Sequence, residues 1–133
     1  MSDTQGHLYQ AHHNENLAAD LLSKLIYKDW LITTSFYSAI HYVEAKLATR
    51  TPPIHPLKDV PRDSSGRAYV SPHQFREDLV HRHYKSIFKE YRMLKEKSEQ
   101  ARYQCVLDTI TEKLTKDCFL IYLKRIKNEL GLN

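Results

Sequence analysis

Two arginines and three histidines lie close together in the middle of the chain, between positions 73 and 84. Four residues separate Arg76 from His81, and six separate it from His83. A guanidinium can hold a phosphate through two parallel hydrogen bonds, and a histidine near its ordinary pKa can move a proton. RNA supplies its own nucleophile, the 2′-hydroxyl, so such a pair needs no metal ion to cleave it. The segment therefore predicts phosphodiester chemistry, with Arg76 and either His81 or His83 as catalytic residues.

The geometry of a helix separates these candidates. At about 100° per residue, Arg76 and His83 lie within about 20° of each other, and His73 lies about 60° away. His81 points elsewhere, close in angle to Phe88. The helical wheel therefore favours His83 as the companion of Arg76, and both histidines are kept as candidates.

Neighbouring polar residues are expected to contact the substrate, namely His73, Arg82 and Tyr84. An arginine on a basic helix is more often solvated or paired with a nearby acid than catalytic. Glu77, next to Arg76, would compete with a phosphate for the guanidinium. The second interpretation is therefore that these residues have no catalytic role. No cysteine or carboxylate completes a set of metal ligands at standard spacing around these histidines, so we predict neither a metal nor a cofactor.

The composition narrows the class of protein. With 133 residues the chain is long enough to bury one core, which predicts a single domain over 1–133. A formal charge of +4 and eight histidines favour association with polyanions such as RNA. Cys105 and Cys118 lack metal-ligand spacing and the N-terminus lacks signal-peptide character, so a reduced, cytoplasmic protein is expected. No apolar run approaches the roughly 20 residues that cross a bilayer, so no membrane association is predicted.

Apolar residues at helical spacing predict an all-α bundle. The expected helices cover about residues 7–26, 27–49, 72–97, and a last stretch that starts near Thr109 and ends at Gly131. That last helix is marked by Leu107, Ile110, Leu114, Cys118 and Ile121. Four of the five prolines fall between Pro52 and Pro61, so residues 50–70 are expected to form a long surface loop. Short connections elsewhere favour antiparallel neighbours.

Capping residues fix where some of these helices start. Ser71 is the expected N-cap of the third helix, with Pro72 at its first position and Gln74 closing a capping box. The segment from Thr109 to Glu112 offers another capping box, and Asp29 is the expected N-cap of the second helix.

The helix expected over 27–49 is apolar on most sides. Such a helix in a small protein has to be enclosed by other helices or by a second copy of the chain. Its narrow stripe of small or polar residues includes His41, which is expected to face either a partner chain or the helix of Arg76. Trp30 is expected to anchor the core at the start of the helix.

Four short strings of sequence follow one another in a familiar order. They are Tyr27-Lys28-Asp29-Trp30, the segment FYSAIHYVEA at 36–45, His73-x-x-Arg76, and Ser98-Glu99-Gln100-Ala101-Arg102-Tyr103. Together they resemble the HEPN domain family in its small stand-alone prokaryotic form, over about residues 8–125. The resemblance implies an up-and-down bundle of four or five helices that usually forms a homodimer through its central helices.

The resemblance also implies a function. Active members of the family are metal-independent endoribonucleases of toxin and defence systems, with an arginine, four to six residues and then a histidine, paired across the dimer interface. Arg76 matches this motif with His81 and with His83, and the commonest family spacing favours His81. The alternative is a non-catalytic HEPN module that binds a nucleotide, a nucleic acid or a nucleotidyltransferase partner.

Two further positions are assigned through the same resemblance. Some family toxins are modified by a nucleotidyltransferase on a tyrosine two positions after the motif histidine. Counted from His81, that position holds His83, and the tyrosine is shifted to Tyr84. Arg102, at the junction of the third and fourth helices, is expected to form a structural corner by pairing with a buried acid or a carbonyl.

Overall fold

The structure is a computed structural model that describes residues 3–104 and 109–132. Its elements are α1 (Asp3–Lys24), α2 (Lys28–Ala48), α3 (Pro56–Asp59), α4 (Pro72–His83), the 3₁₀ turn η1 (Lys85–Ile87), α5 (Phe88–Tyr103), α6 (Glu112–Asp117), the π-helical segment η3 (Cys118–Leu123) and α7 (Lys124–Glu129). The predicted all-α class is confirmed, and the arrangement is compatible with a bundle of four to five helices.

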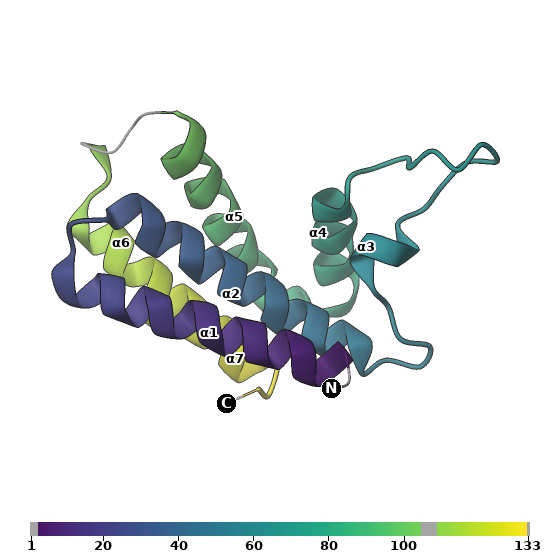
Figure 1. The fold of residues 1–133 in the computed structure, drawn as a ribbon, viewed down its shortest axis with the longest axis horizontal. Helices are drawn as coiled ribbons and strands as arrows, with labels where there is room; N and C mark the ends of the chain where they lie inside the picture. The colour runs from purple at the N-terminus through teal and green to yellow at the C-terminus, as the bar shows by residue number, and fades with distance from the viewer. Residues whose placement is uncertain (1–2, 105–108, 133) are drawn as a thin grey trace.

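The long helices pack side by side (Figure 1). α1 and α2 form an antiparallel pair, and α5 and the stretch from α6 through η3 to α7 pack against α2. α4 and the connection from α2 to α4 extend to one side of this bundle, and the connection contains the one-turn helix α3. In the described part of the chain, no helix is long and apolar enough to span a bilayer.

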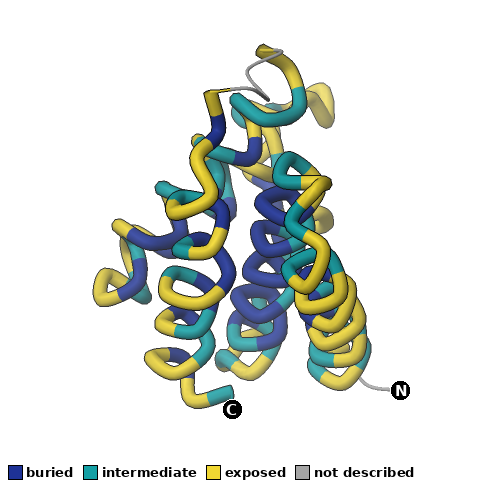
Figure 2. The backbone as a smooth tube through the Cα atoms, turned by 90° about the vertical axis from the view of Figure 1, so that its left-hand side faces the viewer, coloured by how far each residue is buried: buried dark blue, intermediate teal, exposed yellow. Residues whose placement is uncertain are grey.

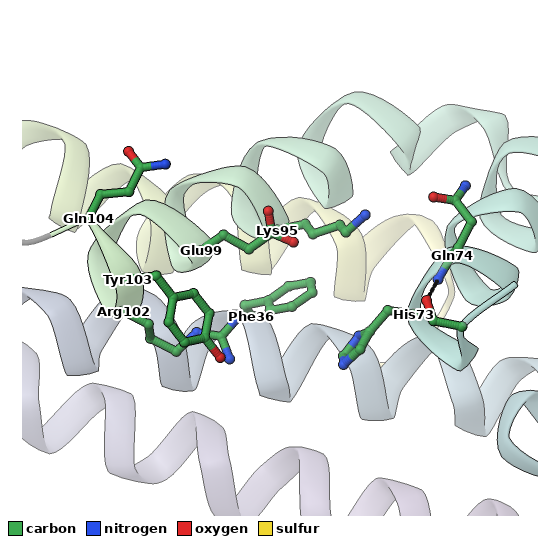
Figure 3. Close-up of a pocket in the computed structure, with 9 residues that line it drawn as sticks. Phe36, His73, Gln74, Lys95, Glu99, Arg102, Tyr103 and Gln104 are labelled. Carbon is green, nitrogen blue, oxygen red and sulfur yellow. Dashed lines mark hydrogen bonds between the residues drawn. The ribbon is translucent and has the colours of Figure 1, made fainter.

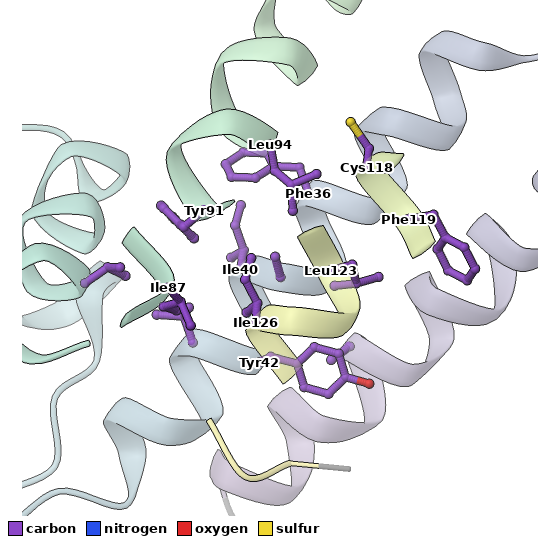
Figure 4. Packing of buried hydrophobic residues seen from close by; sticks show 14 of the residues in the cluster. Phe36, Ile40, Tyr42, Ile87, Tyr91, Leu94, Cys118, Phe119, Leu123 and Ile126 are labelled. Atoms are coloured by element: carbon purple, nitrogen blue, oxygen red, sulfur yellow. The ribbon is translucent and has the colours of Figure 1, made fainter. Parts of the chain in front are cut away.

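α2 is the centre of the core, as its apolar sequence predicts (Figure 2). Phe36 and Ile40 of α2 meet Tyr91 and Leu94 of α5 and Leu123 of η3, all of them buried (Figure 4). Helices enclose α2 within a single chain, so its apolar faces are covered without a second copy.

Two expectations for the start of α2 are wrong. The helix begins at Lys28, and Tyr27 occupies the N-cap position without a side-chain hydrogen bond, so Asp29 is not the cap. Trp30 is 55% exposed and does not anchor the core. The next residue, Leu31, is fully buried, and a step of about 100° around the helix turns Trp30 toward solvent.

The Ser71 cap of α4 is confirmed. The backbone N–H of Gln74 donates to Ser71 Oγ over 3.1 Å, and Pro72 occupies the first turn. The helix was expected to continue to about residue 97, which is wrong. It ends at His83, because Tyr84 leaves helical geometry with φ −133° and ψ 54°, and α5 starts a new helix after η1. Side chains at three- and four-residue spacing stay buried on both sides of such a turn, so the apolar pattern alone does not reveal it.

The last helical stretch ends as expected, but it starts two residues later than the capping box from Thr109 to Glu112 predicts, with Thr111 and not Thr109 as the N-cap. Thr111 Oγ1 accepts from the backbone N–H of Leu114, and Gly131 ends the stretch with a φ of +70°. Cys118 is buried there, and burial raises the pKa of its thiol to about 12. Cys105 and Leu107 lie outside the described residues.

Candidate functional site

Arg76 points inward from α4 and is only 6% exposed. Its Nε donates to Glu44 Oε1 of α2 over 3.0 Å, and its Nη2 donates to the same oxygen. Glu77, the expected competitor for this guanidinium, instead pairs with Lys95, with 3.4 Å between Oε2 and Nζ. The charge of Arg76 is therefore neutralised inside the protein by a carboxylate 32 positions earlier in the chain.

His73 is the imidazole that the structure brings to Arg76. Its Nδ1 lies 3.2 Å from Arg76 Nη1, one helical turn away. Burial lowers the pKa of His73 below its ordinary value, and the positive charges of Arg76, Lys95 and Arg102 lower it further. Because a guanidinium has no lone pair to offer, Arg76 donates this bond and His73 Nδ1 accepts it. His73 is thus held neutral with a fixed orientation.

His81 and His83 are not brought to Arg76. The ring of His81 packs edge-on against Phe88, with 4.7 Å between ring centroids, and that of His83 lies 6.3 Å from the ring of Tyr84. Arg76 donates instead to Glu44 and to His73.

These histidines instead lie at the outer end of α4. His81 and Arg82 line a shallow surface hollow of about 370 Å³. Burial and the positive charges of Arg50 and Arg82 lower the pKa of His83, and Arg50 also lies over the ring of Tyr84. The helical wheel placed Arg76 and His83 on one side, but the guanidinium reaches back to α2 while His83 ends the helix at the turn into η1.

A cavity of about 440 Å³ opens between the start of α4, α2 and the second half of α5 (Figure 3). We call it the α4–α5 pocket. Its lining residues are Phe36, Ser71, His73, Gln74, Lys95, Glu99, Arg102, Tyr103 and Gln104. His73 lies at one end and Arg102 with Tyr103 at the other, and the ring of Phe36 lies between them. The ring of Tyr103 is open to solvent, with 73% of the residue exposed.

Arg102 is held at this pocket by neutral groups. Its Nη1 donates to the hydroxyl of Tyr37 over 2.9 Å and its Nε to the carbonyl of Ser98 over 3.3 Å, which confirms the expected bond to a carbonyl. Its guanidinium carbon lies 5.5 Å from the ring centroid of Tyr37 and 5.0 Å from that of Tyr103. Among the described residues, no carboxylate forms an ion pair with Arg102.

Arg102 and Tyr103 are a signal for this pocket in the sequence, although the family resemblance implies only a structural role for Arg102. Arg102 and Tyr103 are adjacent, and a basic residue beside an aromatic one is typical of surfaces that bind single-stranded nucleic acid. Lys95 lies seven residues before Arg102 on the same helix, so helical periodicity places both on one face. His73 lies 29 residues before Arg102, and only the fold brings it to the same pocket.

A second cavity, of about 350 Å³, lies on the other side of Arg76. Its lining includes His7 of α1, His41 and Glu44 of α2, and Arg76. His7 Nδ1 is 3.1 Å from Glu44 Oε2 and 3.0 Å from His41 Nδ1. Of the two places expected for His41, the structure shows the one beside the Arg76 helix. Burial lowers the pKa of His41.

Comparison with known proteins adds no assignment to this geometry. No model of a known protein family matches the chain, and no curated protein is significantly similar to it. The resemblance to HEPN domains therefore stays a prediction from the residue patterns.

Proposed function

We propose that this chain is a HEPN-like module that binds single-stranded RNA in the α4–α5 pocket. The observation that supports this most directly is Arg102, a cation stacked on two tyrosine rings and free of any described carboxylate partner. Arg76 offers the contrast, because Glu44 already neutralises it. A phosphate that approaches Arg102 displaces no ion pair.

The other residues of the pocket match the remaining parts of a nucleotide. The exposed ring of Tyr103 offers a face on which a base can stack, an interaction worth about 1 to 3 kcal/mol per base. Lys95 adds a second positive charge at the pocket, and its pairing with Glu77 is long at 3.4 Å. Glu99 also lines the pocket, so the two cations exceed the carboxylates of the lining by one. A volume of about 440 Å³ falls in the range of small-ligand sites, so the pocket has room for a nucleotide.

Cleavage of the bound RNA is the second candidate function, and the position of His73 in the α4–α5 pocket favours it. Because Nδ1 accepts from Arg76, the proton of the neutral His73 ring lies on Nε2, and Nδ1 can take the proton of a 2′-hydroxyl only by giving up its bond to Arg76. The 2′-oxygen then attacks the phosphorus, the bond from phosphorus to the 5′-oxygen breaks, and a protonated group must donate a proton to the leaving 5′-oxygen. His73 is the one imidazole that lines this pocket within the described chain. In a homodimer, the second group would come from the other copy, as the family resemblance implies for toxin and defence ribonucleases.

The motif residues have other roles in this function than their spacing predicts. Arg76 becomes a positioning residue for His73, because binding a phosphate would require it to leave Glu44. His81, His83, Arg82 and Tyr84 are then surface or packing residues, in contrast to the catalytic and binding roles that the motif spacing predicts.

RNA binding is tested by fluorescence anisotropy with a labelled single-stranded RNA at several salt concentrations. We expect Arg102→Ala to weaken binding several-fold and to lower the slope of log affinity against log salt by about 1. Arg92→Ala is the matched control, because Arg92 is an exposed arginine on the same helix that is paired with Glu96. Equal affinity of Arg102→Ala and the wild type, with both folded, would contradict the pocket as the RNA site.

The aromatic contribution is tested with Tyr103. Tyr103→Ala should weaken binding, and Tyr103→Phe should retain it because stacking uses the ring face and not the hydroxyl. If Tyr103→Phe binds as weakly as Tyr103→Ala, the hydroxyl and not the ring is the recognition element.

Cleavage is tested with purified protein, RNA and a chelator, followed on a denaturing gel. If the second candidate function holds, cyclic phosphate ends form, an oligonucleotide with 2′-deoxy sugars is left intact, and His73→Ala abolishes the products. His81→Ala and His83→Ala are the comparison variants. Loss of cleavage in either of them, with His73→Ala still active, would return the site to the Arg76 motif.

A further inference from the structure

Three metal-binding atoms converge in the cavity on the other side of Arg76. His7 Nδ1 lies 3.0 Å from His41 Nδ1 and 3.1 Å from Glu44 Oε2. The distance from His41 Nδ1 to Glu44 Oε2 is 3.9 Å. Ligands of a tetrahedral Zn²⁺ with bonds of about 2.0 to 2.1 Å lie about 3.3 Å from one another. The observed separations bracket that value, so a single ion fits between the three atoms after shifts of a few tenths of an ångström.

The fold holds these atoms in place from two helices. His41 and Glu44 lie one turn apart on α2, and His7 comes from α1, which packs along α2. The carboxylate of Glu44 uses its other oxygen, Oε1, to bind Arg76. A ligand carboxylate that is fixed by an outer hydrogen-bond donor is a usual feature of metal sites in proteins. Arg76 would have this role here.

Without a cation, the hydrogen bonds between these three side chains cannot all be formed at once. Each neutral imidazole has one donor nitrogen and one acceptor nitrogen. The same nitrogen of His7 faces both His41 Nδ1 and Glu44 Oε2, so one proton must serve two contacts. A metal ion between the three atoms would use all three lone pairs at once.

The cavity is accessible and close to neutral overall. Its volume of about 350 Å³ leaves room for water or another ligand at an open coordination position. Asp3 and Glu44 in its lining offset the charges of Arg76 and Lys58. His55 also lines the cavity, and its Nε2 lies 3.4 Å from Asp3 Oδ2, so two more potential metal ligands are present there.

From this arrangement we infer that His7, His41 and Glu44 form a binding site for a divalent transition-metal ion of the zinc type. Two imidazoles and one carboxylate suit Zn²⁺ and its neighbours, whereas Mg²⁺ and Ca²⁺ prefer sites made of oxygen atoms. The site differs from the one that was excluded in the sequence, because its ligands come from α1 and α2 and not from the histidines of α4. It is independent of the proposed RNA binding, which uses the other cavity.

The site is tested by isothermal titration calorimetry of the full chain, stripped of metal with a chelator, using Zn²⁺. We expect one ion per chain, and at least tenfold weaker binding in His7→Ala and in His41→Ala. His13→Ala is the matched control, because His13 is exposed on the same helix as His7 and should leave binding unchanged. Circular dichroism in chelator verifies that each variant is folded.

Three further measurements sharpen this test. Zn²⁺ should raise the melting temperature of the wild type and of His13→Ala but not of His7→Ala, since a ligand that binds the folded state alone stabilises it. Co²⁺ used as a spectroscopic probe should give visible absorption bands that are lost in His41→Ala. Arg76→Lys should weaken Zn²⁺ binding by about 10-fold to 100-fold if Arg76 orients the Glu44 ligand.

Specific results would overturn the inference. Equal Zn²⁺ affinity in the wild type, His7→Ala and His41→Ala would place the metal on other histidines of the chain. A stoichiometry that falls by the same fraction for every histidine removed, His13 included, would show scattered surface binding. Stabilisation by Mg²⁺ as strong as that by Zn²⁺ would overturn the assignment to transition metals. None of these results depends on RNA.

Discussion

Glu15 and Glu44 are two of the three carboxylates that are buried in the described part of the chain, and their surroundings differ. Glu15 of α1 is satisfied on both oxygens by Lys124, by Lys127 and by the hydroxyl of Tyr42, so it ties α1 to α2 and to the last helix. Glu44 of α2 binds Arg76 with one oxygen and faces the imidazoles of His7 and His41 with the other.

The two sites differ in whether the partners of the carboxylate can lose a proton or bind a metal ion. The lysines and the tyrosine around Glu15 are all donors at neutral pH, so that cluster is closed and structural. The imidazoles beside Glu44 can give up a donor proton or bind a metal, and they line a cavity. Similar burial of a negative charge therefore gives a structural link in one place and a candidate binding site in the other.

The largest effect is expected from Glu44→Gln. This change leaves the guanidinium of Arg76 buried without its carboxylate, which we expect to lower the free energy of unfolding by about 3 kcal/mol. Urea unfolding in the presence of chelator measures it. Glu96→Gln is the control, since Glu96 pairs with Arg92 on the surface. The double variant with Arg76→Met should recover part of the loss, and a strictly additive result would contradict a direct coupling.

Glu15→Gln should have a smaller effect on the free energy of unfolding, of about 2 kcal/mol. The side chain of Lys124 is already 42% exposed and can turn to water when the carboxylate is removed, whereas Arg76 cannot. The same urea experiment measures this difference. Glu112→Gln is the matched control, because Glu112 pairs with Lys116 at the surface and should contribute well under 1 kcal/mol. An effect of Glu15→Gln larger than that of Glu44→Gln would reverse the comparison.

The Glu15 cluster should also appear in the acid stability of the fold. Burial by itself raises the pKa of Glu15, but hydrogen bonds from Lys124, Tyr42 and Lys127 outweigh it and lower the pKa from 4.5 to about 2. Because the folded-state pKa lies below the unfolded one, the stabilisation is complete above about pH 4.5 and is lost as the pH falls toward 2. Stability measured across this range should fall less steeply in Glu15→Gln, and identical slopes would contradict the assignment.

The smallest effect concerns His73. Its pKa is lowered from 6.5 in the folded protein, so the folded state disfavours the proton and stability decreases slightly as the pH falls below 6.5. RNA affinity should change in the opposite sense, since a proton on His73 adds positive charge to the α4–α5 pocket. An NMR titration of the His73 ring and anisotropy at several pH values measure the two effects. His73→Gln should remove the part of the pH dependence of RNA affinity due to this group.

The sequence predicted several features of this fold that depend on neighbouring residues. The Ser71 cap, the Gly131 stop and the apolar α2 are local signals, because capping and helical spacing act over three or four residues. The turn at Tyr84 was missed, since the spacing of buried side chains is similar in a helix and in two helices joined by a short turn.

What the sequence by itself determined is the helical class, most of the helix limits and the supply of arginines and histidines. Only the tertiary structure decided which of them meet. The partner of Arg76 is 32 positions away in Glu44, and His7 and His41 are 34 positions apart. Helical periodicity orients a side chain around its own axis, but the packing of one helix on another decides which group it contacts.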